Sequence, residues 1–285
     1  CFHNAFRFSE KLKKEVTNGF AYRLLGSVYW FNFDLKKAES AFSKALEYLN
    51  LEDYENRLIS YCLRGWTYTL LGELQKAFQD IKAVEKNLEK IQNPMILAQI
   101  YHSCSIVYSW GAGDYSRAYE YSGKSHSLAE QTEYYIFQYS SLFSKGLAFF
   151  YQRHFSEAKE IFKKGLDLAD RYHIRIGIGI CQAMMAESML WKGEILEAHE
   201  ISSHYLKNYE QVQEKLASLI FLKIEAVYDF LKGRIHQALI RIQEGIEEAR
   251  ERGIVFILLF FISFKIKIYE ELQQEKEKKE WNLIL

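Results

Sequence analysis

Glu73-Leu-Gln-Lys-Ala77 is the stretch of this sequence that decides its fold, because five further segments share its pattern. Each segment places an aliphatic or aromatic residue second and ends on alanine. The six alanines are Ala38, Ala77, Ala118, Ala158, Ala198 and Ala238. They follow one another at intervals of 39, 41, 40, 40 and 40 residues. So constant a period indicates a repeat protein with one supersecondary unit per period.

Two further sets of equivalent positions, here called columns, recur with the same period. A small residue precedes each alanine by about twelve positions, and a glycine precedes most of them by five. The small residues are Gly26, Gly65, Ser105, Gly146, Ala186 and Ala226, and the glycines are Gly72, Gly113, Gly193 and Gly233, replaced by Phe33 and Arg153 in two repeats. A glycine inside a helix costs about 1 kcal/mol relative to alanine, so its recurrence predicts that a neighbouring helix needs the space. Ser105 is displaced by one residue, and we expect the nearby Gly111-Ala-Gly113 to absorb that extra residue.

Each period divides into two amphipathic stretches, such as residues 53–71 and 73–91. Apolar residues recur at spacings of three and four, which is the pattern of a helix with one buried face. The glycine between the stretches suits a left-handed helix C-cap. The sequence contains a single proline, Pro94, and this scarcity of proline also favours helices joined by short connections. We therefore predict an all-α, right-handed superhelix of about six to seven helix pairs, with at least twelve antiparallel helices and no sheet.

The boundaries follow from the columns. Residues 18–252 are predicted to hold six repeats, and residues 1–17 the tail of a preceding helix. Residues 253–285 are either a C-terminal capping helix or a truncated seventh repeat, and the sequence does not choose between them. In the fifth repeat, Gly177-Ile-Gly179 predicts a first helix that begins late. Because the chain begins with Cys1, we expect it to be a piece of a longer protein.

These columns of small, aromatic, glycine and alanine residues resemble the tetratricopeptide repeat over residues 20–252. The period near 40 residues departs from the usual 34, and the proline that follows each second helix in that family is missing. The long-period variety resembles the sensor arrays of maltose-type transcription activators and related large bacterial signal-transduction ATPases. The resemblance implies a binding surface on the concave wall, which the first helix of every repeat builds.

Composition and motifs give no support to other functions. Lys plus Arg and Asp plus Glu number 37 each, so the chain carries no net charge that would favour nucleic acid or an anionic membrane. The four cysteines are far apart, and no histidine pair has metal-ligand spacing. Nucleophile and phosphate-binding motifs do not occur. We expect no catalytic residue, cofactor or metal, and we expect a cytoplasmic location.

Mapped onto this sequence, the concave columns hold an aromatic and charged set of residues. We predict that partners bind through Arg23, Trp30, Trp66, His102, Trp110, Phe143, Glu187, Trp191 and Lys223. Tryptophan and arginine are the residues that most often dominate interface energies. The partner is expected to be a protein or peptide, or a small effector, bound by a sensor domain of a bacterial regulatory protein. The alternative is a passive scaffold or co-chaperone adaptor without an effector.

Overall fold

A computed structural model describes residues 19–207 and 214–284, and over these residues it contains helices and no strand. The predicted tail at residues 1–17 lies outside the described residues. The α-helices are α2 (Gly19–Phe31), α3 (Leu35–Tyr48), α4 (Tyr54–Leu71), α5 (Leu74–Glu85), α6 (Pro94–Val107), α7 (Tyr115–Gln131), α8 (Tyr135–Tyr151), α9 (Phe155–Arg171), α10 (Ile178–Lys192), α11 (Ile195–Lys207), α12 (Lys215–Leu231), α13 (Ile235–Arg252) and α14 (Val255–Ile284). A 3-10 turn, η1 (Leu88–Lys90), and a π-helical turn, η2 (Tyr108–Ala112), complete the order.

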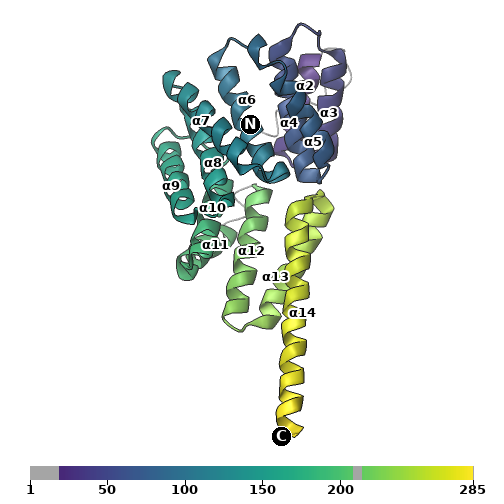
Figure 1. Ribbon diagram of the computed structural model, residues 1–285, viewed down its shortest axis with the longest axis vertical. Coiled ribbons are helices and arrows are strands. Elements are labelled where there is room, and N and C mark those ends of the chain that lie inside the picture. Colours follow the sequence, from purple (N-terminus) through teal and green to yellow (C-terminus); the bar gives the residue numbers. More distant parts are fainter. Residues whose placement is uncertain (1–18, 208–213, 285) are drawn as a thin grey trace.

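The helices pack as consecutive antiparallel pairs, α2 with α3 through α12 with α13, and α14 follows the last pair. Neighbouring pairs stack along a curved path, which gives the predicted right-handed α–α superhelix (Figure 1). One pair cannot bury its apolar face alone, whereas stacked pairs share a continuous core. The prediction of an all-α superhelical repeat is confirmed. Among the described helices, none is both long enough and apolar enough to cross a membrane.

The joint inside two of the pairs explains the glycine in the small-residue column. A Cβ added to Gly26 would lie 2.6 Å from ring atoms of Phe42, and one added to Gly146 would lie 2.5 Å from Cε1 of Phe162. Both rings are completely buried. The two helices approach so closely at these positions that the glycine supplies the space for the ring. The predicted close packing of a neighbouring helix is confirmed here.

The alanine column and the turn column also have clear structural reasons. All six alanines of the repeat pattern are 0 % exposed. The glycines five residues earlier have positive φ angles, from 63° at Gly113 to 92° at Gly193. Phe33 and Arg153, which replace glycine in two repeats, adopt the same conformation with φ of 60° and 65°. The turn geometry is therefore a requirement of the repeat, and it is imposed even on residues with a Cβ.

The extra residue of the third repeat forms a π-helical turn. The interval between Ala77 and Ala118 is one residue longer than the standard 40, and η2 lies within it. A π-turn accommodates one additional residue in a helix without breaking it. Gly113, at φ 63°, then ends the turn in the left-handed conformation.

The fifth repeat confirms the late start of its first helix. α10 begins at Ile178 after Gly177, whose φ is 74°. The carboxylate of Glu214, which immediately precedes α12, accepts a hydrogen bond from the backbone N–H of Ile180 at 2.9 Å. A carboxylate at this end of a helix satisfies donors that lack an intrahelical partner.

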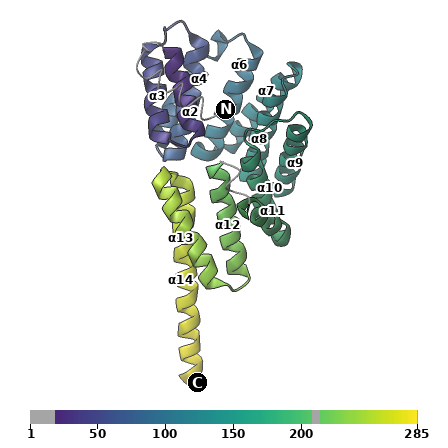
Figure 2. The same cartoon turned by 180° about the vertical axis from the view of Figure 1, so that it is seen from behind.

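The superhelix returns on itself. The N-terminal end of α14 lies against the C-terminal end of α4, and both views show these ends adjacent (Figures 1 and 2). Val255 Cβ is 3.0 Å from the position that a Cβ on Gly72 would occupy, and Phe256 stacks on Trp110 with ring centroids 5.6 Å apart. Beside this contact, a hollow of about 370 Å³ is lined by the α2–α3 turn and by the end of α13. Beyond it, α14 projects from the body (Figure 1).

The glycine joint predicts different outcomes for two equivalent substitutions. Gly146→Ala should destabilise the protein by about 1–3 kcal/mol because the new methyl group overlaps the buried ring of Phe162. Gly65→Ala places its Cβ 3.4 Å from the nearest atom, so it should be neutral or stabilising by up to about 1 kcal/mol. Urea unfolding of both variants measures the difference. Equal stability of the two variants would contradict this assignment of the joint.

Candidate functional site

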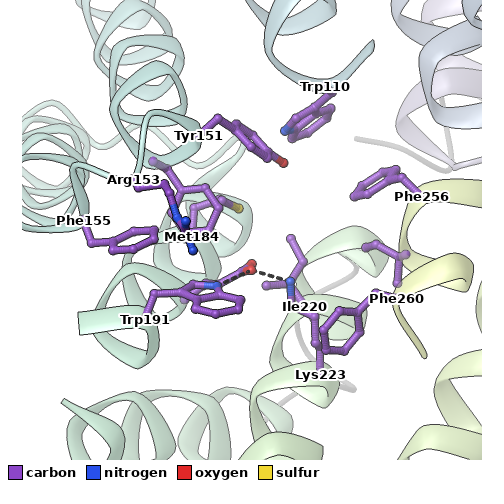
Figure 3. A pocket seen from close by; sticks show the side chains of 13 residues that line it. Trp110, Tyr151, Arg153, Phe155, Met184, Trp191, Ile220, Lys223, Phe256 and Phe260 are labelled. Carbon is purple, nitrogen blue, oxygen red and sulfur yellow. Dashed lines mark hydrogen bonds and ion pairs between the residues drawn. The ribbon is translucent and has the colours of Figure 1, made fainter. Parts of the chain in front are cut away.

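A cavity of about 310 Å³ opens on the inner wall of the superhelix. Its lining comes from helices far apart in the sequence: η2, α8, α9, α10, α12 and α14. The lining residues are Trp110, Phe150, Tyr151, Arg153, Phe155, Met184, Glu187, Trp191, Ile220, Lys223, Phe256, Ile257 and Phe260. α14 supplies one wall of the cavity through Phe256, Ile257 and Phe260 (Figure 3).

An ion pair lies at the polar side of this cavity. Glu187 is only 4 % exposed, and its Oε1 accepts from the ammonium of Lys223 and, at 3.3 Å, from Nε1 of Trp191 (Figure 3). The Lys223 ammonium also lies 4.8 Å from the ring centroid of Phe260. A buried carboxylate is tolerated only with such partners, because an unpaired buried charge is strongly destabilising. Glu187 therefore holds Lys223 and Trp191 in fixed positions.

Aromatic rings form the other walls. Phe155 stacks on Trp191 with centroids 6.1 Å apart, and Trp110 stacks on Phe256. Burial raises the pKa of Tyr151, so its hydroxyl stays protonated at neutral pH and can donate a hydrogen bond. These walls combine a large apolar area with a few polar groups, which is the usual composition of a ligand site.

Arg153 is the exposed cation of the site. It lies in the α8–α9 turn with φ of 65°, and its side chain lines the cavity (Figure 3). Within residues 19–207 and 214–284, its guanidinium has neither an ion pair nor a hydrogen-bond partner. The other cation of the cavity, Lys223, is already paired with Glu187.

The structure brings four of the nine predicted site residues together at the cavity: Trp110, Glu187, Trp191 and Lys223. Three others continue from it as a series of ring contacts. Trp66 lies 6.2 Å from Trp110, 5.9 Å from His102 and 4.5 Å from Trp30, measured between ring centroids.

The two remaining predicted residues lie apart from the cavity. Arg23 is half-buried with its guanidinium carbon 4.9 Å from the ring centroid of Phe20. Phe143 is only 6 % exposed, and its ring centroid lies 5.9 Å from that of Phe162 in the core. Its role in binding a partner stays a prediction.

The sequence columns missed several lining residues. Arg153 occupies the glycine column and was treated as an exception, and Phe155 belongs to the aliphatic column that opens the second helix. Phe260 is three residues before Ser263, the small residue of the seventh first-helix. Continuing the concave columns into residues 253–285 would have found Phe260. Phe256 has no such signal, because its place depends on closure of the superhelix.

The described residues hold no group of three or more His, Cys, Asp or Glu side chains arranged to bind a metal ion. The recognisable chemistry is therefore that of the cavity and of the ring series beside it. Both lie on first helices and on the turns that follow them, except that Phe155 begins the second helix α9.

Comparison with known proteins supports the repeat assignment. The sequence pattern of the family described as "Tetratricopeptide repeat" matches residues 21–48. The fold is of the tetratricopeptide type over the described helices. A search of curated proteins finds no match to this chain.

Solved structures share the whole superhelix at low sequence identity. A Rap protein complexed with Competence and Sporulation Factor is 13% identical, with a TM-score of 0.67 over 95% of this chain and 80% of that one. NprR in complex with its cognate peptide NprX is 16% identical, with a TM-score of 0.66 over 93% and 77%. A STAND protein with a tetratricopeptide repeat sensor from Pyrococcus horikoshii is 16% identical, with a TM-score of 0.58 over 96% of this chain and 45% of that one. At these identities, the likeness concerns the tetratricopeptide-type fold.

His102 makes the stability of this inner wall depend on pH. Burial lowers the pKa of His102 to about 4, against an ordinary value of 6.5, and a hydrogen bond to the backbone of Ser140 opposes the shift. The folded state therefore favours the neutral ring. The contribution of the neutral His102 ring to the free energy of unfolding is fully present above pH 6.5. It is lost as pH falls from 6.5 towards 4, because the unfolded chain binds the proton first.

We expect His102→Gln to reduce this pH dependence. Relative to wild type, the variant should be less stable at pH 7.5 and should recover about 1 kcal/mol or more of that difference by pH 4.5. Urea unfolding at the two pH values measures it. His173→Gln, in the exposed α9–α10 turn, is the matched control and should leave the pH dependence unchanged. A parallel pH profile for wild type and His102→Gln would contradict the buried neutral state.

Proposed function

We propose that this chain is a protein-interaction and sensor domain of a larger, cytoplasmic, bacterial regulatory protein. It binds a peptide, protein or small effector on its concave face and has no catalytic role of its own. The observation that carries the proposal is the cavity, in which Trp110, Glu187, Trp191 and Lys223 converge on the inner wall. These side chains combine apolar area, an ion pair and hydrogen-bond donors at one place.

Structural neighbours of the same fold that bind partners support this proposal. The Rap protein is described in complex with Competence and Sporulation Factor, and NprR with its cognate peptide NprX. The P. horikoshii protein carries its repeats as a sensor, and this chain spans about half its length. We propose that residues 18–252 form the binding array and that residues 253–285 cap it. α14 also completes the cavity.

A ligand in the cavity would act on the curvature of the superhelix. It would touch η2 of the third repeat and α14 beyond the sixth repeat at the same time. Such a ligand binds the closed form better than any form in which α14 has moved away from Trp110. By differential affinity it shifts the population towards closure, which other parts of a regulatory protein can detect.

The concave assignment predicts which variants lose binding. A partner is first isolated from the source cell with this chain as bait, and its affinity is then measured by isothermal titration calorimetry. Trp191→Ala should weaken binding by about 2 kcal/mol or more, because truncation of a tryptophan at the centre of an interface commonly costs that much. Trp191 is half exposed, so the variant is expected to fold.

Lys163→Ala, on the exposed face of the second helix α9, is the matched control and should change the affinity by less than about 0.5 kcal/mol. Circular dichroism confirms folding of both variants. Loss of binding in Lys163→Ala together with normal binding in Trp191→Ala would refute the concave site. If the partner binds but leaves the contact between Phe256 and Trp110 unchanged, the passive-scaffold alternative is favoured.

A further inference from the structure

The cavity contains many hydrogen-bond donors and only one carboxylate. Arg153, Lys223 and Tyr151 line it with N–H or O–H groups, whereas the single N–H of Trp191 is donated to Glu187. An indole and a guanidinium can only donate, and a protonated ammonium likewise. The single carboxylate, on Glu187, is already shared between Lys223 and Trp191.

The donor excess continues in the ring series beside the cavity. The indole nitrogen of Trp66 is fully buried and has no hydrogen-bond partner among the described residues. A buried donor without an acceptor destabilises a protein by about 1–3 kcal/mol. The inner wall therefore holds more hydrogen-bond donors than acceptors.

The charged side chains of the cavity indicate that its ligand is an anion. Glu187 is held by Lys223, so it is not free to receive a cation. The guanidinium of Arg153 has no partner in the described chain, and its planar N–H groups match the two oxygens of a carboxylate.

The size and the walls of the cavity indicate the rest of the ligand. A volume of about 310 Å³ admits a small molecule or a single side chain. The rings of Phe155, Trp191 and Phe256 line the cavity with apolar surface.

We propose that the cavity binds a small carboxylate whose body is apolar and aromatic, with its carboxylate on Arg153 and its ring between Trp191 and Phe256. This inference rests on the proposed concave function and specifies its ligand class. The acid can be a free small molecule or the carboxylate of an aromatic residue at the end of a peptide. Both sources present the same group to the same donors.

The test compares an acid with its neutral amide. The probes are 3-phenylpropionate and 3-phenylpropionamide, titrated into the full chain by isothermal titration calorimetry at low salt. The acid should bind at least about tenfold more tightly than the amide, which corresponds to one charge-assisted hydrogen bond. Arg153→Gln should abolish this preference, so that the acid and the amide bind the variant with equal affinity.

Arg175→Gln is the matched control, because Arg175 is also an exposed arginine in a turn between helices and lies outside the cavity. It should retain the full preference for the acid. The peptide Ala-Ala-Phe with a free C-terminus, compared with its C-terminal amide, forms the second arm. Stronger binding of the peptide acid than of 3-phenylpropionate identifies a peptide source, and the reverse order identifies a small molecule. Either order supports the ligand class when it depends on Arg153.

Three results would overturn the inference: equal affinity of acid and amide, an unchanged preference in Arg153→Gln, or no binding of any probe at millimolar concentration. Binding of the isolated partner to Trp191→Ala distinguishes these three results from a failure of the proposed function. If this variant loses the isolated partner while acid and amide bind wild type equally, the concave site stands and the carboxylate inference is wrong. If it keeps the partner, the concave function itself is wrong.

Discussion

The contact between a helix glycine and a buried phenylalanine ring is the constraint on which the rest of this structure depends. Gly26 and Phe42 make it in the first repeat, and Gly146 and Phe162 make it in the fourth. Because the ring fills the space of the missing side chain, the two helices of a pair are fixed at a short separation. Interiors packed to this density deform little. The helices of the first and fourth pairs are therefore held at a fixed, short separation.

Accumulated over successive pairs, this fixed geometry closes the superhelix. A repeat array gains its curvature from a small rotation per repeat. Here the rotation brings α14 back to α4, so that Leu35 and Leu70 share one apolar core with Ile257 and Phe261. Closure then creates the cavity, since Phe256 and Phe260 form a wall opposite the third, fourth and fifth repeats. The proposed binding site therefore depends on the curvature of the superhelix, and any ligand that spans the cavity acts on that curvature.

The sequence predicts well whatever repeats locally. The alanine and glycine columns specify the helix pairs and their turns, and the 41-residue interval reveals the extra residue that becomes the π-turn. The positive φ of Phe33 and Arg153 shows that the turn persists where the glycine does not. These features depend on residues fewer than about forty positions apart, and the helix pairs and their turns recur in every repeat.

The binding surface is predicted less well, because it depends on the sum of all rotations. The columns identify Trp110, Glu187, Trp191 and Lys223, which meet at the cavity. They do not reveal that Phe143, in the same set of columns, is buried in the core. They also miss Arg153 and Phe256, one because it replaces a turn glycine and the other because α14 reaches Trp110 only through closure.

The central claim is that the superhelix is closed, with the α2–α3 turn beside the end of α13. Lys36 and Glu251 are exposed residues that line opposite sides of the hollow at this contact. Nitroxide labels at these two positions, in a background where the native cysteines are replaced, report their separation by pulsed electron paramagnetic resonance. The account predicts a single short and narrow distance distribution. A broad distribution centred at long distances would show that the two ends move independently and would contradict the closed superhelix.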